Sequence, residues 1–498
     1  MRFLFRILLA GFCVAASARA QSTEPILADA IPDPQLAPGG PAVTIDLRNY
    51  FAVPGLTSVP PGYDSIFPTG GGRSVITFAL VQQAPALASV VLSGSTLTFT
   101  PAGSGSGSVV IRAANEQGAG VTVTVGVTIS ATPPIFETQP RSLTMAAGST
   151  AVLDAQVSGA YRFRWERDGQ TVQEGSSSAL VISPATASHA GSYQLIAINA
   201  HGETRTSAAQ LGIVDTAPQY RGRLINLSIL MRAGLGDKAL TVGAVVGPLD
   251  SAGELPLVMR AVGPTLGPPP FYVPDTLQDP TMAFYAAGSA SPIDSNDNWG
   301  GSEAMRTAFA SVGAFALPAD SLDSAIVRRA PGVGAYTVQV TGKGDSEGAV
   351  LAEIYDASGD GRTSASPRLI NVSALVDLRS GDDMTVGFVI SGQTARTVLV
   401  RGAGPALARF GVTGTMRDPE LHLYDTSSRS QILGRNRDWG GALEIGNAAQ
   451  AVGAFPFGSG VTKDAALLVT LPPGSYTARL HGGSSGGGKA IVEVYEVP

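Results

Sequence analysis

The second half of the chain is an internal duplication, in which residues 223–356 align with residues 368–496. Each copy begins with Arg-Leu-Ile-Asn, and Arg-x-x-Gly-Pro, Asp-Pro, Trp-Gly-Gly and Val-Gly-Ala-Phe segments follow in the same order. Because both copies carry the same pattern, we expect them to share one fold. Each contains roughly seven or eight strand-like segments, which is enough for a two-sheet sandwich.

Apolar and polar residues alternate with a period of two along most of the chain, as expected for strands with one buried face. The 61 glycines and 34 prolines among 498 residues, with only 14% charged residues, are typical of short strands joined by tight turns. The exception is a spacing of four and three in each C-terminal copy, at Met305, Phe309 and Val312 in the first. The sequence therefore predicts an all-β protein of tandem β-sandwich domains, with one short helix in each C-terminal repeat.

The N-terminus has the pattern of a cleavable secretory signal over residues 1–20. Arg2 and Arg6 precede an apolar run, and Ala18-Arg19-Ala20 supplies the small residues of a cleavage site. No later stretch provides the roughly 18 apolar residues of a membrane-spanning helix, so no transmembrane segment is expected. Cys13, the only cysteine, lies inside the signal, and the large Phe12 before it disfavours a lipoprotein anchor. The mature chain is thus expected to have no disulfide.

Removal of the signal takes away three arginines and no acids, which moves the formal charge from −6 to −9. An acidic chain of this kind is an unlikely partner for nucleic acid.

Residues 24–131 contain an Ile-Asp-Leu strand that leads to Tyr50-Phe51, then Leu97-Thr98-Phe99 and a final valine-rich strand. This order resembles the dystroglycan-type cadherin-like domain. The resemblance implies a sandwich fold, but no calcium site, because Asn115-Glu116 stands where cadherins carry acidic clusters.

Residues 134–214 carry Trp165 before Asp168-Gly169, and then Ala190-Gly191-Ser192-Tyr193. These motifs, in this order, resemble an I-set immunoglobulin domain. The resemblance places Tyr193 at a tyrosine corner, and it places Ala155 and Leu195 where that family has its disulfide.

The repeats, residues 221–357 and 367–498, resemble an uncharacterised tandem module at the C-termini of exported bacterial proteins. The linker between them, residues 358–366, is rich in Gly, Ser and Thr, so the repeats are expected to fold separately, either mobile or docked. The expected arrangement is four sandwiches in a row.

Two kinds of residue are candidates for ligand binding. The first three oxygen donors of a calcium loop could come from Asp356, Ser358 and Asp360. However, Pro367 stands where the closing glutamate of such a loop would be needed. We therefore favour the interpretation that this segment is an ordinary Asx turn. No cofactor is expected, with calcium as the one alternative. Trp299 and Trp439 could stack on a sugar ring, but an aromatic plug between sheet and helix is the more common role.

Other candidate chemistry is poorly supported. The Gly-x-Ser-x-Gly pattern at residues 483–487 is followed by a strand, whereas a nucleophile elbow needs a helix. The four histidines share no metal-ligand spacing, which disfavours a zinc hydrolase. The pairs Arg260 with Glu353 and Arg401 with Glu493 are interpreted as buried ion pairs in preference to ligand sites.

The sequence thus favours a secreted or cell-surface modular binding protein, with periplasmic location as an alternative, and no catalytic residues are assigned. Its expected partner is an extracellular protein or polysaccharide. The first rival hypothesis is a carbohydrate-binding accessory protein, which an exposed row of tryptophan or tyrosine on the C-terminal repeats would favour. The second is a secreted hydrolase with two carboxylates across a pocket between those repeats.

Overall fold

The computed structural model describes residues 25–27, 31, 34–36, 39–52, 76–83, 87–115, 118–129, 132–359, 362–363, 365–426, 431–457, 463–482 and 486–498. The predicted signal, residues 1–20, lies outside the described residues, as does Asp360 of the candidate calcium loop. The described chain consists mostly of strands arranged in sandwich-like sheets, which confirms the all-β prediction.

The N-terminal module packs a four-stranded sheet, in the order β2-β9-β8-β5, with a three-stranded sheet, in the order β3-β7-β6. Alternate residues of β7 and β8 point inward, so Leu97, Phe99 and Ile111 are fully buried in one core. The strands are β1 (Ile26–Leu27), β2 (Gln35–Leu36), β3 (Val43–Asp46), β4 (Phe51–Ala52), β5 (Thr77–Gln82), β6 (Ala88–Ser93), β7 (Thr96–Pro101), β8 (Gly105–Ala114) and β9 (Gly120–Ile129).

The second module has the immunoglobulin arrangement around Trp165, which is fully buried and donates its indole N–H to the Ser178 carbonyl at 3.0 Å. The buried side chains of Ala155 and Leu195 belong to the same core, so apolar packing takes the place of a disulfide. The Tyr193 hydroxyl donates to the His189 carbonyl at 2.7 Å, as a tyrosine corner does. The strands are β10 (Ile135–Phe136), β11 (Leu143–Ala146), β12 (Ala151–Leu153), β13 (Val157–Ser158), β14 (Arg162–Arg167), β15 (Gln170–Gly175), β16 (Leu180–Ile182), β17 (Gly191–Asn199), β18 (Gly202–Arg205) and β19 (Ala209–Val214).

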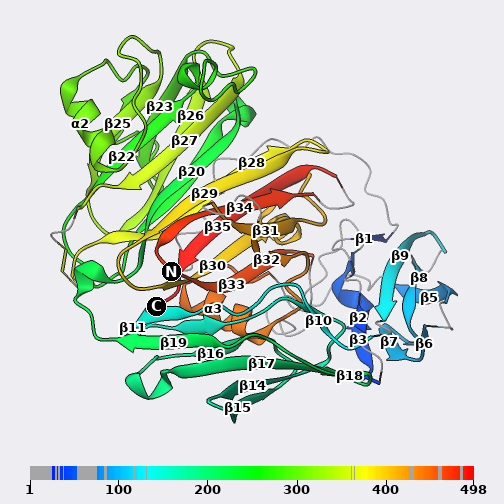
Figure 1. The fold of residues 1–498 in the computed structure, drawn as a ribbon. Coiled ribbons are helices and arrows are strands. Elements are labelled where there is room, and N and C mark those ends of the chain that lie inside the picture. The colour runs from blue at the N-terminus through cyan, green and yellow to red at the C-terminus, as the bar shows by residue number, and fades with distance from the viewer. Residues whose placement is uncertain are drawn as a thin grey trace, which may run out of the picture.

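The two C-terminal repeats together form one sandwich of two eight-stranded sheets (Figure 1). The sheet orders are β25-β22-β27-β20-β29-β34-β31-β32 and β24-β23-β26-β21-β28-β35-β30-β33. The strands of the first repeat are β20 (Arg223–Ala233), β21 (Leu240–Gly247), β22 (Leu255–Val262), β23 (Pro280–Ala286), β24 (Asp294–Asn296), β25 (Ser324–Ala330), β26 (Gly334–Gly342) and β27 (Gly348–Asp356). Those of the second are β28 (Arg368–Leu378), β29 (Asp383–Ser391), β30 (Arg396–Ala403), β31 (Glu420–Asp425), β32 (Ile432–Asn436), β33 (Ala465–Leu471), β34 (Gly474–His481) and β35 (Gly488–Glu496).

This continuity corrects the expectation of four separate sandwiches. In one sheet β20 pairs antiparallel with β29, and in the other β21 pairs antiparallel with β28. One hydrophobic core runs through both repeats, from Leu224 to Val494. At the junction, each repeat taken alone would have two strands with unpaired backbone groups, β20 and β21 in the first and β28 and β29 in the second. Pairing β20 with β29 and β21 with β28 supplies hydrogen-bond partners to all four strands. The Gly/Ser/Thr-rich linker between the repeats therefore joins halves that are already held together.

Each repeat carries the predicted helix, α2 (Glu303–Ser311) in the first and α3 (Leu443–Ala451) in the second. Ser302 caps α2, because its side chain accepts a hydrogen bond from the Met305 N–H at 3.3 Å. The preceding Gly301 has a φ of +62°, and a Cβ there would lie 2.6 Å from the Ala319 carbonyl oxygen. The second glycine of the Trp-Gly-Gly motif is therefore needed for the tight turn into the helix.

The immunoglobulin-like module is docked on the second repeat. The Val152 N–H donates to the Thr470 hydroxyl at 2.7 Å, and the Thr397 hydroxyl donates to the Thr150 carbonyl at 2.5 Å. The Val152 side chain enters an apolar cluster of the second repeat beside Leu399. These buried contacts fix the orientation of one module relative to the other.

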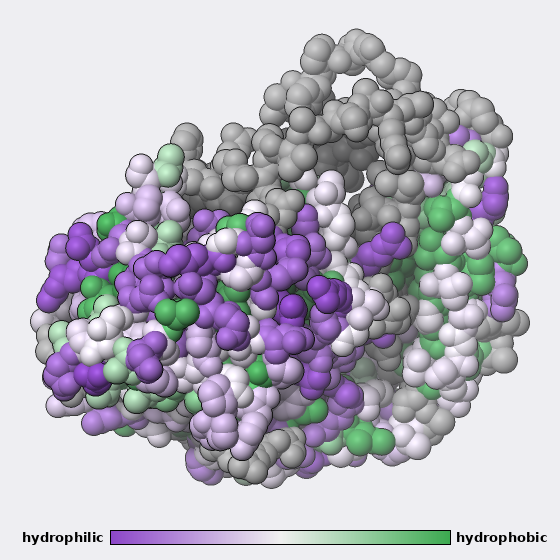
Figure 2. Space-filling model, turned by 90° about the horizontal axis from the view of Figure 1, so that it is seen from above, coloured by the Kyte–Doolittle hydropathy of each residue, from purple (hydrophilic) through white to green (hydrophobic). Residues whose placement is uncertain are grey.

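The view from above shows a largely hydrophilic surface over the first repeat and more apolar residues on the N-terminal module, at the right (Figure 2). Two valines of the N-terminal module are exposed, Val81 at 60% and Val91 at 55%.

Candidate functional site

Each C-terminal repeat contains the same buried polar group. Arg260 contacts Glu353 at 2.5 Å in the first repeat, and the Tyr355 hydroxyl donates to the other oxygen of Glu353 at 2.7 Å. Arg401 lies 3.1 Å from Glu493 in the second repeat. The exposed fractions of both pairs are between 0% and 5%, so the structure shows the buried ion pairs that the sequence predicted.

Aromatic rings enclose the two guanidinium groups. The Arg260 guanidinium carbon lies 4.4 Å from the centre of the Phe315 ring, and that of Arg401 lies about equally far from two rings, 4.2 Å from Phe455 and 4.1 Å from Phe457. Burial raises the pKa of the Glu493 carboxyl above its ordinary value, although the charge of Arg401 opposes this. Both groups are closed to solvent and lie within the core of the repeats.

Trp299 is a packing residue in this structure. It is 2% exposed, its ring lies 5.6 Å from that of Phe309, and its indole N–H donates to the Pro318 carbonyl at 3.0 Å. The Trp439 ring is half-buried, 5.7 Å from the Phe457 ring in the corresponding cluster. A sugar could not reach the face of Trp299 without displacing the helix above it.

The Asp356 carboxylate is buried and faces Arg362, whose two terminal nitrogens donate to its two oxygens at 2.8 Å each. The Ser358 N–H also donates to Asp356 at 2.9 Å, which is the hydrogen bond of an Asx turn. A calcium ion at this loop would have to displace the guanidinium group. Asp360, the third proposed ligand, lies outside the described residues.

A cleft of about 540 Å³ lies where the two repeats meet. Its wall includes Phe410 and charged side chains of both signs. Lys238 donates to Glu347 at 2.7 Å, and this contact holds the pKa of the Glu347 carboxyl below its usual value. The charged residues that line the cleft are Arg232, Lys238, Arg379, Lys489, Glu347, Asp377 and Asp382.

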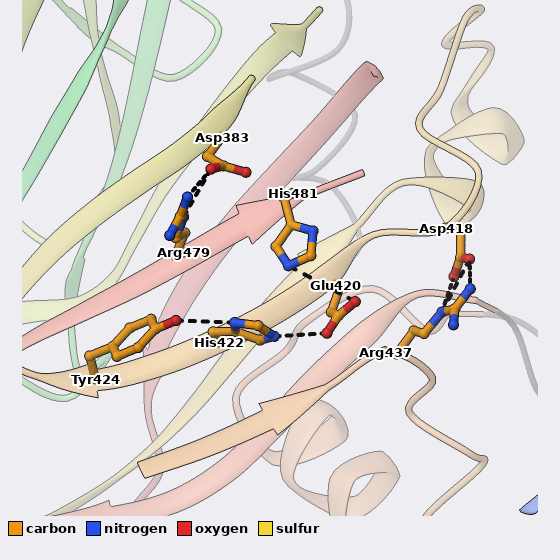
Figure 3. Close-up of polar contacts among 8 residues, drawn as sticks. All are labelled: Asp383, Asp418, Glu420, His422, Tyr424, Arg437, Arg479 and His481. Carbon is orange, nitrogen blue, oxygen red and sulfur yellow. Dashed lines mark hydrogen bonds and ion pairs between the residues drawn. The ribbon is translucent and has the colours of Figure 1, made fainter. Parts of the chain in front are cut away.

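Two of the four histidines meet a carboxylate on the outer face of β31 and β34 (Figure 3). Glu420 and His422 are two residues apart on β31, so both point to the same face, while Leu421 between them is fully buried. His481 ends β34 directly opposite Glu420. We refer to Glu420, His422 and His481 as the imidazole cluster.

The contacts within the imidazole cluster are short. The His422 Nε2 lies 2.8 Å from the Glu420 Oε1, and the His481 Nε2 lies 3.9 Å from the Glu420 Oε2. The two rings stand at 83°, with their centres 5.0 Å apart. One ligand atom from each residue lies within 4.8 Å of the others, and among the described residues this is the group of three that could hold a metal ion.

The cluster was not predicted from the sequence, because the four histidines share no metal-ligand spacing along the chain. His422 and His481 become neighbours only through the register of β31 and β34. The local signal was Glu420-Leu421-His422, an alternation that puts two ligand-type side chains on one face of a strand.

Comparison with known proteins identifies one module. A family model described as "Immunoglobulin domain" matches residues 133–199. No curated protein matches the chain.

Solved structures of immunoglobulin tandems match parts of the chain. "Tandem Ig repeats of Dlar" is 17% identical over 29% of this chain and 83% of its own, with a TM-score of 0.16. Murine CEACAM1b is 22% identical over 25% of this chain and 67% of its own, with a TM-score of 0.15.

The chain therefore contains an immunoglobulin-like domain within an all-β architecture. The described α-helices, α2 and α3, have nine residues each, and no helix in the described part is long and apolar enough to cross a membrane.

Proposed function

We propose that the protein is an exported, modular binding protein of the adhesion or scaffold type, which acts at or outside the cell surface. Its N-terminal signal pattern supports export, and its immunoglobulin-like domain supports a role in binding. The proposal includes a partner outside the cytoplasm, either an extracellular protein or a polysaccharide, and no catalytic step.

The observation that carries this proposal is the cleft between the repeats. Its volume of about 540 Å³ is within the range of small-ligand sites, roughly 300–1,000 Å³. Its wall combines an aromatic ring with charges of both signs, which suits a polar ligand such as a saccharide chain or a protein loop. Because both repeats contribute to the wall, the cleft depends on their common sandwich.

One carboxyl of the cleft wall, that of Glu347, is unsuited to general-acid catalysis. A general acid in a glycosidase requires a carboxyl whose pKa is raised. Lys238 instead lowers the pKa of Glu347, with Arg232 and Arg379 contributing in the same direction. Glu347 is thus held in the ionised form, which supports a ligand-binding role for this wall.

The carbohydrate-binding hypothesis is the second candidate, because of the exposed aromatic pair Phe271 and Tyr272 in the first repeat. Their exposed fractions are 40% and 71%. This pair lies on a loop of the first repeat. It is a different candidate site from Trp299, which the sequence suggested for sugar stacking and which is buried. The Tyr272→Ala variant should lose the binding of any glycan that stacks on this aromatic pair.

The test uses the untagged mature chain, residues 21–498, on arrays of polysaccharides and of extracellular proteins. Binding to the cleft should weaken at least about tenfold in Arg232→Glu and in Arg379→Glu. Arg328→Glu, a matched charge reversal at a side chain that is 53% exposed on β25, should bind as the wild type does. Equal binding by all three variants would exclude the cleft, and cleavage of a bound polysaccharide would favour the hydrolase hypothesis.

Export is tested separately by mass spectrometry of the chain recovered from the periplasm or medium of its host. A mature N-terminus at Gln21 would support the signal, whereas an intact Met1 in the cytoplasm would contradict export.

A further inference from the structure

The imidazole cluster combines ligand types that favour a transition metal. Two imidazoles and one carboxylate form the set of protein ligands found in several catalytic zinc sites, where water or a substrate completes the coordination. The two imidazoles belong to His422 and His481, and the carboxylate belongs to Glu420. Glu420 can contribute one oxygen to each side, since its Oε1 faces His422 and its Oε2 faces His481.

The present distances need only small side-chain rotations to fit a metal ion. Bonds of about 2.0–2.1 Å in a tetrahedral zinc site separate the ligand atoms by roughly 3.4 Å. The ligand atoms of the imidazole cluster lie within 4.8 Å of one another. The backbone does not have to move, because the register of β31 and β34 already places Glu420 opposite His481.

A neighbouring hydroxyl can orient one of the ligands. The Tyr424 hydroxyl lies 3.1 Å from the His422 Nδ1 (Figure 3). When Nδ1 carries the proton and donates it to this hydroxyl, Nε2 presents its lone pair towards Glu420 and His481. Outer contacts of this type fix the tautomer of a metal-binding histidine and increase its affinity for the metal.

The arginines around the cluster have carboxylate partners of their own, so their positive charges are locally balanced. Arg479 donates through Nε to Asp383 at 3.0 Å, beside the cluster on β34. On the other side, Arg435 contacts Glu137 at 2.5 Å, and Arg437 contacts Asp418 at 2.5 Å. Glu420 faces the two imidazoles instead of a guanidinium group.

The first repeat shows that the fold does not need these side chains. The register places Thr281 opposite Thr341 on β23 and β26, as it places Glu420 opposite His481 on β31 and β34. The two threonine hydroxyls form a hydrogen bond of 2.6 Å, and Ala283 takes the position of His422. The imidazole cluster is therefore an addition to the shared backbone.

Solvent can reach all three side chains, since 18% of His422, 25% of Glu420 and 28% of His481 is accessible. We propose that Glu420, His422 and His481 form a surface site for a divalent cation of the zinc class. Three protein ligands leave at least one position for water or for an oxygen or nitrogen of a bound partner. None of the three residues lines the cleft between the repeats, so the site does not rest on the proposed function.

The test is zinc binding to the untagged mature chain, measured by isothermal titration calorimetry and by metal analysis after dialysis. The wild type should bind about one zinc ion per chain through this site. The triple variant Glu420→Thr, His422→Ala, His481→Thr installs the residues of the first repeat, so it should fold and lose that zinc ion. His201→Ala, which removes an exposed histidine of the immunoglobulin-like module, should bind zinc as the wild type does.

Two further measurements separate ligation from a purely structural role. Tyr424→Phe should weaken zinc binding about 10–100-fold, because it removes the hydroxyl that orients His422. Cobalt(II) added to the wild type should give the visible absorption of an ion with nitrogen ligands, and the triple variant should lack it. Unchanged zinc stoichiometry in a folded triple variant, or no zinc bound by the wild type, would overturn the proposal.

Discussion

Replacing Arg401 by methionine is a direct test of the buried ion pairs. Methionine keeps much of the volume of arginine but removes the charge that faces Glu493. The Arg401 guanidinium also donates to the Phe455 carbonyl at 2.8 Å, and that contact would be lost. The variant would leave a carboxyl group that is 3% exposed without a cationic partner.

The expected cost follows from the burial of that carboxyl. Removing one member of a buried ion pair typically lowers the free energy of unfolding by about 3–5 kcal/mol. In a cooperative unit as large as the double repeat, each kcal/mol corresponds to roughly 2–4 °C in melting temperature. Arg401→Met should therefore melt roughly 6–20 °C below the wild type at neutral pH.

The pH dependence of this cost has a defined sign. Burial already raises the pKa of Glu493 in the folded wild type, and Arg401 opposes that rise. A carboxyl whose pKa is higher in the folded than in the unfolded state stabilises the folded state when it is protonated. This contribution is complete at pH values below the unfolded pKa, and it is lost as the pH rises through the folded pKa. Without Arg401 the folded pKa rises further, so the deficit of the variant should be largest at pH 8 and smaller near pH 4.5.

The assay is thermal unfolding followed by circular dichroism at both pH values. The double variant Arg401→Met, Glu493→Gln should recover much of the loss, because no buried charge remains. Arg328→Met is the surface control, at an arginine that is 53% exposed and 3.9 Å from its partner, and it should change stability by less than about 0.5 kcal/mol. An equal deficit at pH 4.5 and pH 8, or no recovery in the double variant, would refute this account.

Three other substitutions test separate features. Burial raises the pKa of the Asp154 carboxyl to about 6 in the folded state. The protonated carboxyl therefore stabilises the folded state below the unfolded pKa near 3.8, and this contribution is lost as the pH rises through about 6. Asp154→Asn should therefore raise the melting temperature at pH 8 and leave it unchanged near pH 4, and a lower melting temperature at pH 8 would contradict this. Thr397→Val removes the hydroxyl bonded to Thr150 and Thr470, which should cost about 1–3 kcal/mol and speed hydrogen exchange of the Val152 amide; unchanged exchange would contradict the docking. Trp299→Ala should cost about 3–5 kcal/mol in unfolding experiments, because it opens a cavity in the core, whereas a cost near zero would show that the ring is not a packing element.

The parts of the fold that depend on local pattern could be predicted from the sequence. Alternating residues gave the strands, and the spacing of Met305 and Phe309 gave the position of α2. The immunoglobulin-like motif gave the buried Trp165 and the Tyr193 hydrogen bond. Each of these features needs only residues of one module.

The parts that depend on pairing between distant strands could not be predicted. The sequence of β20 is compatible with a free edge, and its pairing with β29 is specified only by the complementary edge of the other repeat. The same limit applies to His422 and His481, because a shift of one residue between β31 and β34 would place their side chains on opposite faces. The ion pair between Asp356 and Arg362 could not be predicted either, because Arg362 lies in the segment that the sequence analysis assigned to a linker.

The junction between the repeats has the symmetry of a two-fold homodimer, in which the first strand of each half meets the second strand of the other. A homodimer separates when its concentration falls, whereas two halves on one polypeptide keep a high effective concentration at any dilution. Covalent fusion also ends the requirement that both halves carry identical residues. One half can keep the Thr281–Thr341 pair while the other carries Glu420 and His481 at the same positions, which a symmetric dimer of identical chains could not do.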